Sequence, residues 1–338
     1  MNAPVTPQRV AVLGAGAWGT ALALHISRNG HPVCLWAHHA EHAEAMNAER
    51  HNPRFLPEIR FPDKLTASGD LAEAMAEADI VLVVVPSHAF RATLAAIRPL
   101  LKPTQWLAWA TKGLELETQK LLHQVAAEEL GETVVPTVVS GPTFAREVAR
   151  GLPGAITVAS TSADHAERIA EILHNEHFRA YTASDVIGVE LGGALKNVLA
   201  IAAGIADGLG FGANTRAALI TRGLHELMRL GLALGGRAET FMGLAGLGDL
   251  ILTCTDNQSR NRRFGIGVGQ GRDRDEVLAE IGEVVEGLKS ARAAHALAVS
   301  HGIDMPIAEQ VYRVLYENED PHDAVRDLLD REVKPESV

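Results

Sequence analysis

Short runs of consecutive apolar residues mark the first half of the chain. They occupy residues 9–13, 32–37, 80–85, 106–110, 134–139 and 155–159. Because apolar side chains at consecutive positions indicate strands buried on both faces, these runs predict a parallel sheet. Amphipathic segments such as 118–129 and 163–174 separate the runs and predict connecting helices. The alternation of strand and helix signals is typical of a doubly wound α/β domain.

The pattern changes near residue 189, where strand signals become rare. Long Ala-, Leu- and Gly-rich stretches at 190–208 and 215–234 predict helices, and helical periodicity resumes over 276–329. The segment 265–275 is dense in Gly and Arg and predicts a loop, and residues after 331 predict a polar tail. We therefore expect an N-terminal Rossmann-like doubly wound sheet at 1–188 and an all-α-helical domain at 189–338.

Composition narrows the class of partner. With 338 residues and 47% hydrophobic positions the chain is long enough for two cores. Its formal net charge of -11 argues against nucleic acid and anionic membranes as partners. The two cysteines, Cys34 and Cys254, form no C-x-x-C pattern, which fits the reducing cytoplasm. Glycines interrupt the apolar run 10–24 and no other run reaches membrane-spanning length, so we expect no stable membrane insertion.

A glycine signature follows the first predicted strand. Gly14, Gly16 and Gly19 form G-x-G-x-x-G between that strand and a helical pattern. Gly14 permits the tight turn, Gly16 lets the backbone approach a pyrophosphate, and Gly19 lets the helix pack on the strand. Glycine-rich turns also begin helices without a ligand, but the strand–turn–helix context favours a dinucleotide site.

The end of the second predicted strand bears on cofactor choice. NAD-selective sites usually place Asp or Glu there, whereas this chain has histidine at His38 and His39. No carboxylate repels a 2′-phosphate, so we expect NADP or NAD to bind, with NADPH favoured. The cluster of His38, His39 and His42 could instead hold a metal, but it lacks a second ligand group at zinc-motif spacing, and we expect no metal.

Two candidate groups lie where predicted strands end. Lys112 follows the run 106–110, and the segment 140–145 follows another apolar strand and begins a helix. Open α/β sheets bind ligands at the carboxyl ends of their strands, so both could face a substrate. A solvated lysine and an ordinary helix cap explain the same residues without a ligand.

The helical half contributes three further candidates. Lys196 lies on a helix that is almost free of charge, and small residues surround it at helical spacing, which favours a cleft and acid–base chemistry. Asp249, in the glycine-dense stretch 243–250, needs a partner that Lys196 can supply, although it could also brace a turn. The segment 259–263 concentrates hydroxyl, amide and guanidinium donors, which suits either a phosphate clamp or a solvated basic loop.

Taken together, these motifs resemble those of the bacterial NAD(P)-dependent glycerol-3-phosphate dehydrogenases. The segments that carry the resemblance occur in family order: the G-x-G-x-x-G turn at 14–19, Thr-Lys-Gly at 111–113, Ser-Gly-Pro-Thr-Phe-Ala at 140–145, Gly-Ala-Leu-Lys-Asn at 193–197, Gly-Leu-Gly-Asp-Leu at 246–250 and Ser-Arg-Asn at 259–261. The combination is specific, whereas the first motif alone is not. The resemblance implies a homodimer with its active site in the cleft between a Rossmann domain and a helical domain.

The resemblance also implies roles for individual residues. Lys196 is the expected proton-transfer residue. The expected cofactor contacts are Gly14, Gly16, Ala17, Trp18, Gly19, His38, Lys112, Ala145, Arg260, Val284 and Glu286. The expected substrate contacts are Lys112, Gly141, Thr143, Lys196, Asp249, Ser259, Arg260 and Asn261. His38 departs from the family pattern, because many relatives carry Arg there.

The implied reaction is the reversible reduction of dihydroxyacetone phosphate to sn-glycerol 3-phosphate, which supplies glycerophospholipid synthesis. Two alternatives remain at this point. A related two-domain enzyme could reduce a different small acid, such as ketopantoate or a 3-hydroxyacid precursor. A non-catalytic dinucleotide sensor is a second alternative, although it would need neither an isolated lysine nor a phosphate clamp.

Overall fold

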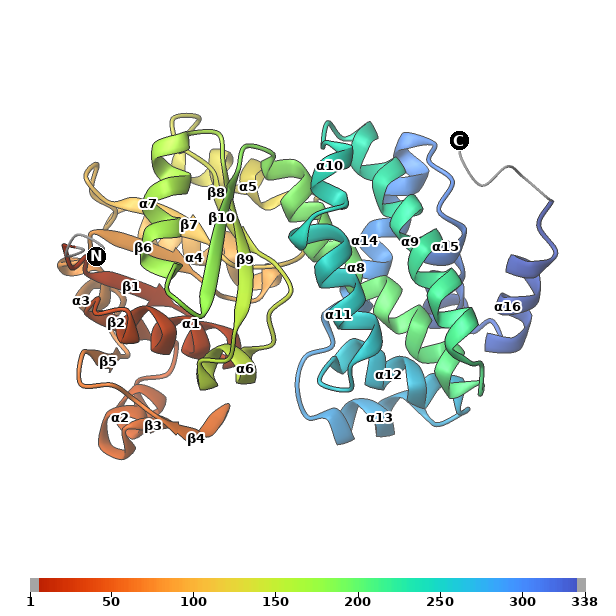
Figure 1. The fold of residues 1–338 in the computed structure, drawn as a ribbon, viewed down its shortest axis with the longest axis horizontal. Coiled ribbons are helices and arrows are strands. Elements are labelled where there is room, and N and C mark those ends of the chain that lie inside the picture. Colours follow the sequence, from red (N-terminus) through yellow and green to blue (C-terminus); the bar gives the residue numbers. More distant parts are fainter. Residues whose placement is uncertain (1–5, 333–338) are drawn as a thin grey trace. The chain divides into compact units, whose positions relative to one another are not determined.

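The computed structural model describes residues 6–332 and divides into two compact units (Figure 1). Unit 1 extends to Glu115 and includes Lys120–Glu190. Unit 2 contains Leu116–Gln119 and continues from Leu191. From residue 333 on, the predicted polar tail lies outside the described residues.

In its described residues, unit 1 is an α/β structure with ten strands. Eight of the strands form one sheet in the order β10-β9-β8-β7-β6-β1-β2-β5, and β3 and β4 form a separate antiparallel pair. The strands are β1 Val10–Leu13, β2 Val33–Trp36, β3 His51–Asn52, β4 Leu56–Arg60, β5 Leu65–Ser68, β6 Ile80–Val83, β7 Trp106–Trp109, β8 Thr137–Ser140, β9 Gly154–Ser160 and β10 Phe178–Ala183. The helices are α1 Ala17–Arg28, α2 Ala40–Glu49, α3 Leu71–Ala76, α4 Ser87–Ile97, α5 Leu122–Leu130, α6 Ala145–Arg150 and α7 Ala163–Leu173.

The strand order reverses between β1 and β6, which are hydrogen-bonded neighbours in parallel register. From β1 the chain proceeds outward through β2 to β5, and from β6 it proceeds the other way through β7 to β8. Every residue of β1 and of β6 is buried, as their consecutive apolar positions predict. Ligands of doubly wound sheets bind at such a switch point, beyond the carboxyl ends of the strands.

Two strands at one edge of the sheet, β9 and β10, run opposite to the other strands. β9 pairs antiparallel with β8, whereas the sequence pattern predicted a parallel sheet. Only the six-residue helix α6 lies in the connection between them, and an antiparallel pair lets so short a connection reverse the chain at one edge. The sequence also gave no signal for β5 and β10, which are short or alternate between buried and exposed positions.

Unit 2 consists of helices throughout its described residues. α8 begins in unit 1 and continues into unit 2. The helices are α8 Val186–Gly208, α9 Ala213–Ala233, α10 Ala238–Phe241, the π-helical turn η1 Leu244–Gly248, α11 Asp249–Thr255, α12 Arg260–Gly269, α13 Arg274–Ile281, α14 Glu286–His301, α15 Pro306–Tyr312, the π-helical turn η2 Arg313–Glu317 and α16 Pro321–Leu329. The predicted fold class, a Rossmann-like sheet followed by an all-α part, is confirmed.

Helix α8 is the core helix of unit 2. It is long and apolar enough to cross a bilayer, yet 94% of its most apolar window is buried inside the protein. Burial within the protein accounts for its composition, because a helix that is apolar all round is typical of a protein core as well as of a membrane.

Helices α8 and α12 touch backbone to backbone through four glycines. A Cβ atom on Gly204 or Gly208 of α8 would overlap a backbone oxygen of α12, and a Cβ on Gly265 or Gly269 of α12 would overlap one of α8. The glycine-rich segment 265–275 was predicted as a loop. This prediction is wrong for residues 265–269, which belong to α12, and for 274–275, which begin α13. Gly265 and Gly269 lie within a helix because their missing side chains allow the close packing.

Replacing Gly204 by alanine should therefore destabilise the protein. The new Cβ would overlap the carbonyl oxygen of Arg262, and overpacking of this kind costs roughly 1–3 kcal/mol. Urea denaturation followed by circular dichroism measures the effect. Gly212→Ser is the control, because no atom lies within 4 Å of a Cβ at Gly212. Equal stability of the Gly204→Ala variant and the wild type would contradict the proposed close contact.

A buried carboxylate joins α9 to α15. Glu226 accepts hydrogen bonds from the backbone N–H groups of Ile307 at 2.7 Å and Ala308 at 3.1 Å, in the first turn of α15. Burial raises the pKa of Glu226 to about 7, because it disfavours the charged form more than these N–H groups and Arg229 favour it. In the folded protein the carboxyl therefore holds its proton to higher pH than in the unfolded chain.

This linkage predicts a pH-dependent stability. Because the folded pKa lies above the unfolded one, the contribution of Glu226 to stability falls as pH rises from about 4.5 to about 7. Between pH 5 and pH 8 the unfolding free energy of the wild type should fall by about 2–3 kcal/mol relative to that of Glu226→Gln. Parallel urea titrations test this, with the exposed Glu44→Gln as control. A difference that stays constant with pH would disprove it.

Candidate active site

The turn between β1 and α1 uses its three glycines in two ways. Gly14 has a φ of +126°, and a Cβ there would lie 2.5 Å from the carbonyl oxygen of Val84, just after β6. A Cβ on Gly19 would overlap the carbonyl oxygen of Gly14. By contrast, no atom lies within 4 Å of a Cβ at Gly16. Gly14 and Gly19 are thus needed to form the turn, whereas Gly16 leaves open space at the start of α1.

This open space suits the pyrophosphate of a dinucleotide. Gly16 is the N-cap of α1 and offers no side-chain acceptor, and the first turn of α1 has no acidic residue. Backbone N–H groups at such a helix start attract an anion. Trp18, in the same turn, has a buried indole Nε1 without a hydrogen-bond partner, and Ala17 beside it is partly exposed. The residues present therefore fit a bound NAD or NADP.

The ends of β7 and β8 bring three predicted site residues together. The Lys112 ammonium and the Thr143 hydroxyl both donate to the carbonyl oxygen of Gly141, each at 3.2 Å. Lys112 Nζ also lies 6.0 Å from the centroid of the Trp18 ring, so this group adjoins the dinucleotide turn. Ala145 begins α6 directly after them.

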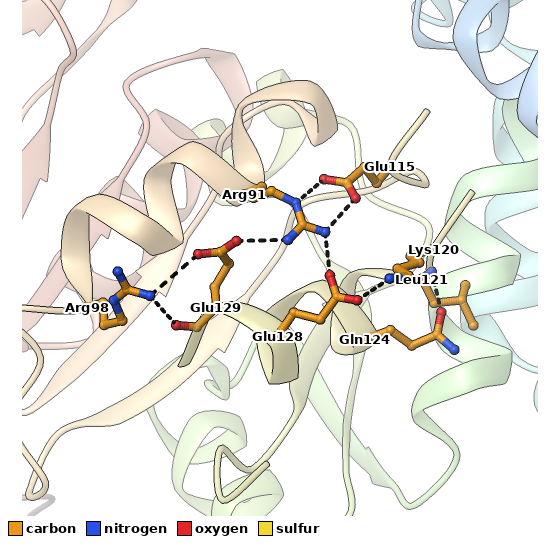
Figure 2. Close-up of polar contacts among 8 residues, drawn as sticks. All are labelled: Arg91, Arg98, Glu115, Lys120, Leu121, Gln124, Glu128 and Glu129. Carbon is orange, nitrogen blue, oxygen red and sulfur yellow. Dashed lines mark hydrogen bonds and ion pairs between the residues drawn. The ribbon is translucent and has the colours of Figure 1, made fainter. Parts of the chain in front are cut away.

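An arginine-centred network holds the segment that follows Lys112 (Figure 2). Arg91 on α4 binds both carboxylate oxygens of Glu115 at 2.7 Å, and it also binds Glu128 and Glu129 on α5. Lys120 pairs with Glu128 from the other end of the segment. Both ends of the connection from β7 to α5 are thus fixed to the two helices, which restrains the backbone that carries Lys112.

The histidines after β2 lie at the surface. His38 is exposed, and its ring contacts those of Trp36 at 5.9 Å and His39 at 4.9 Å between centroids. His42 binds the side-chain oxygen of Asn52 at 3.0 Å. Within residues 6–332 no three metal-ligating side chains gather in one cluster. The structure thus leaves His38 available to a ligand that binds at the end of β2.

In unit 2 a buried ion pair joins the two charged residues that the sequence singled out. Lys196 of α8 donates to Asp249 Oδ1, which confirms the predicted partnership. The side chains are only 9% and 1% exposed. Gly192 makes this approach possible, because a Cβ there would overlap the carbonyl oxygen of Ala245 in η1, just before Asp249. The ammonium thus has a carboxylate partner in the interior, as a buried charge requires.

Asn261 links three helices and binds Asn197, a site residue that was not predicted from the sequence. Its amide donates to the side-chain oxygen of Asn197 at 2.9 Å and accepts from the backbone N–H of Gly287 at 2.8 Å. Asn197 follows Lys196 directly, so Asn261 of α12 is fixed to the helix turn that carries the lysine. The Lys-Asn sequence was the available signal, but spacing alone could not join residues 64 positions apart.

The predicted phosphate clamp forms the first turn of α12. Ser259 is the N-cap and accepts from the backbone N–H of Arg262 at 3.2 Å. Arg260 is 38% exposed and binds the exposed Glu283 at 3.0 Å. Arg262, in contrast, is buried and points into the protein. The basic segment therefore has Arg260 and Arg263 toward the surface and Arg262 inside the protein.

The last two predicted cofactor contacts lie at the start of α14. Val284 is an exposed apolar residue, at 48%. Glu286 is the first residue of α14, and burial raises its pKa above the ordinary value while Lys289 and Arg260 oppose the shift. The predicted site residues therefore form one group in unit 1 and a second group in unit 2.

Comparison with known proteins now assigns the family. A family model for the N-terminus of NAD-dependent glycerol-3-phosphate dehydrogenase matches residues 9–166, and the C-terminal model matches residues 185–326. The chain belongs to the NAD-dependent glycerol-3-phosphate dehydrogenase family. It is 62% identical to the glycerol-3-phosphate dehydrogenase [NAD(P)+] of Methylococcus capsulatus, over 97% of this chain and 98% of that protein.

A solved structure supports the same assignment. The glycerol-3-phosphate dehydrogenase of Coxiella burnetii has a TM-score of 0.93 and 50% identity, covering 96% of this chain and 99% of the other. A ketopantoate reductase of Ralstonia eutropha reaches a TM-score of 0.57 at 19% identity, over 94% and 99%, which shows the fold alone. As a glycerol-3-phosphate dehydrogenase family member, the protein is an NAD(P)-dependent oxidoreductase.

The contrast among the three glycines yields a test of the cofactor site. Gly16→Asp should leave the fold intact, because its side chain enters open space, yet its charge should repel the pyrophosphate and weaken NADPH binding at least tenfold. Fluorescence titration with NADPH measures the affinity, and thermal melting without cofactor checks the fold. Gly16→Ser is the matched uncharged control. Unchanged affinity in Gly16→Asp would remove the pyrophosphate from this turn.

Proposed function

We propose that this chain reduces dihydroxyacetone phosphate to sn-glycerol 3-phosphate with Lys196 as the proton donor. The observation that carries the proposal is the buried ion pair between Lys196, the only lysine or arginine of α8, and Asp249 of α11. A buried lysine of this kind suits acid–base chemistry, because its surroundings rather than bulk water set its protonation. Names of relatives supply the substrate, since the protein of Methylococcus capsulatus is a glycerol-3-phosphate dehydrogenase.

In the proposed mechanism, protonated Lys196 donates its proton to the carbonyl oxygen at C2 of the substrate. Asp249 holds the ammonium in place and stabilises its charge before the transfer. NADPH or NADH, when bound, supplies the hydride for C2. In the reverse direction neutral Lys196 takes the proton of the C2 hydroxyl, and Asp249 stabilises the ammonium that forms.

Cationic and hydrogen-bonding residues bind the substrate in this proposal. We assign Arg260, with Ser259 and Asn261, to the substrate phosphate, and Lys112, Gly141 and Thr143 to substrate contacts in unit 1. The pair between Arg260 and Glu283 is exposed, so a phosphate can replace the carboxylate at little cost. In a chain of net charge -11, these local cations account for binding of an anionic substrate.

The proposal also covers the cofactor contacts, the oligomeric state and the cellular compartment of the enzyme. We assign the adenosine end to His38, where the absence of a carboxylate favours NADPH over NADH. Trp18, Ala17, Ala145, Val284 and Glu286 complete the proposed cofactor contacts. A cytoplasmic homodimer is the proposed form of the enzyme.

The function itself can be tested with four substrate and cofactor combinations. NADPH and NADH oxidation is followed by absorbance with dihydroxyacetone phosphate, and then NADPH oxidation with unphosphorylated dihydroxyacetone and with ketopantoate. Fast turnover confined to the phosphorylated ketone, and faster with NADPH, is the expected result. Efficient reduction of ketopantoate would overturn the proposed substrate, and faster oxidation of NADH would overturn the role of His38.

The role of Lys196 predicts a selective loss of chemistry. Lys196→Ala should lower kcat by about 10²–10⁴-fold, because general acid catalysis contributes on this order, while the Kd for NADPH changes less than about threefold. Lys64→Ala, at an exposed lysine that binds the carbonyl of Gly30, is the control. Thermal melting separates lost chemistry from lost fold. Near-normal turnover in a folded Lys196→Ala variant would eliminate Lys196 as proton donor.

A further inference from the structure

We propose that Asp207 is a positioning residue for substrate phosphate, which acts through Arg262 on the first turn of α12. The inference rests on the proposed function, in which that turn binds the phosphate. Asp207 lies one residue before the end of α8, and none of the motifs in the sequence drew attention to it. Its effect on phosphate recognition follows from three contacts.

The first contact is a carboxylate shared by two arginines. Asp207 is 9% exposed and pairs through Oδ2 with NH2 of Arg262. It also accepts from Arg216 of α9, whose NH2 and Nε donate to Oδ1 at 2.6 and 3.0 Å. Asp207 therefore joins the end of α8 to both α9 and α12 inside unit 2.

The second contact fixes Arg262 itself. Its NH1 binds the side-chain oxygen of Asn257, its backbone N–H binds Ser259 Oγ at 3.2 Å, and its side chain is 9% exposed. Because the guanidinium is buried and paired, Arg262 acts as an internal tether and leaves the surface of the turn to Arg260. The turn that carries Arg260 and Asn261 is thereby held from inside by Arg262.

The third contact is between backbones. The carbonyl oxygen of Arg262 lies where a Cβ of Gly204 would be, so the turn rests directly on α8. The ion pair with Asp207 lies three residues along α8 from this glycine. Backbone packing thus sets how close the turn comes to α8, and the ion pair fixes where along α8 the turn sits.

Loss of the Asp207 charge should therefore shift the turn. Arg262 Nε is buried without a partner, so the guanidinium depends on Asp207 and Asn257 for its hydrogen bonds. A buried guanidinium that loses its counter-ion is strongly destabilised unless it moves toward water. Such movement would carry Arg260 and the N-cap amides away from the phosphate position.

The proton donor should remain in place when the turn shifts. Asp207 follows Lys196 by 11 positions on α8, which corresponds to about 16 Å along a helix axis. Lys196 keeps its own partner, Asp249, in α11. A change at Asp207 should accordingly affect recognition of the phosphate more than proton transfer.

The deciding measurement is the ratio of kcat/KM for dihydroxyacetone phosphate to kcat/KM for unphosphorylated dihydroxyacetone, both with saturating NADPH. Asp207→Asn should lower this ratio at least tenfold, chiefly by raising KM for the phosphorylated ketone, while kcat for either ketone changes less than about threefold. Asp207→Glu restores the charge and should recover most of the ratio. A purely structural role would lower kcat/KM for both ketones alike and leave the ratio unchanged, which would overturn the proposal.

Arg216→Gln is the matched control. It removes the α9 arginine from the same carboxylate and leaves the pair of Asp207 with Arg262 in place, so the ratio should stay within twofold of the wild type. An equal fall of the ratio in Arg216→Gln and Asp207→Asn would show that the carboxylate acts as a general brace, which would also overturn the proposal. If Asp207→Asn fails to fold, Arg262→Lys decides instead. Lysine can keep the pair with Asp207 but loses Asn257, and a several-fold fall in the ratio is expected.

Arg260→Ala separates this inference from the proposed function. If the wild type reduces both ketones equally well, the proposed phosphate clamp fails, and with it the premise of the inference. If the kcat/KM ratio falls in Arg260→Ala but is unchanged in Asp207→Asn, the phosphate clamp is supported and only the positioning role of Asp207 is wrong. A lower kcat/KM ratio in both variants, with an unchanged ratio in Arg216→Gln, supports the phosphate clamp and the positioning role of Asp207.

Discussion

The backbone contact between α8 and α12 sets the geometry of unit 2. Two glycines on each helix let carbonyl oxygens of one helix lie where side chains of the other would otherwise be. Lys196 and Asn197 project from α8, and Ser259, Arg260 and Asn261 stand at the start of α12. The separation between the proposed proton donor and the proposed phosphate-binding turn is therefore fixed by main-chain contact, which is less variable than packing between flexible side chains.

The ion pairs formed by Lys196, Arg262 and Arg260 in unit 2 are of two kinds, buried and exposed to solvent. Lys196 with Asp249 and Arg262 with Asp207 are buried pairs, and breaking a buried ion pair by removing one partner is strongly destabilising. The pair of Arg260 with Glu283 is open to solvent and contributes little to stability. A substrate phosphate bound as proposed could therefore replace Glu283 at Arg260, whereas the buried pairs would persist and hold the helices in place.

Sequence alone predicted the fold class, the dinucleotide turn and the partnership of Lys196 with Asp249, because each rests on local context or on a charge in apolar surroundings. It failed at α12, where glycine signals a loop locally but tertiary packing stabilises a helix. The pair of Asp207 with Arg262 could not be predicted from the sequence either, because the two residues are 55 positions apart and come together only in the folded protein. The ligand contacts of the individual site residues remain predictions.

Glycine has two opposite uses in this protein, and the sequence motif itself does not distinguish them. At Gly16 the missing side chain leaves space for a ligand, whereas at Gly204 and Gly265 it is filled by a neighbouring helix. Each of the latter two costs a helix interior roughly 1 kcal/mol relative to alanine. Larger residues would remove that cost, but would restore the usual interaxial distance of roughly 8–10 Å and move Arg260 away from Lys196. Close packing, rather than helix stability, therefore explains why glycine occupies these positions.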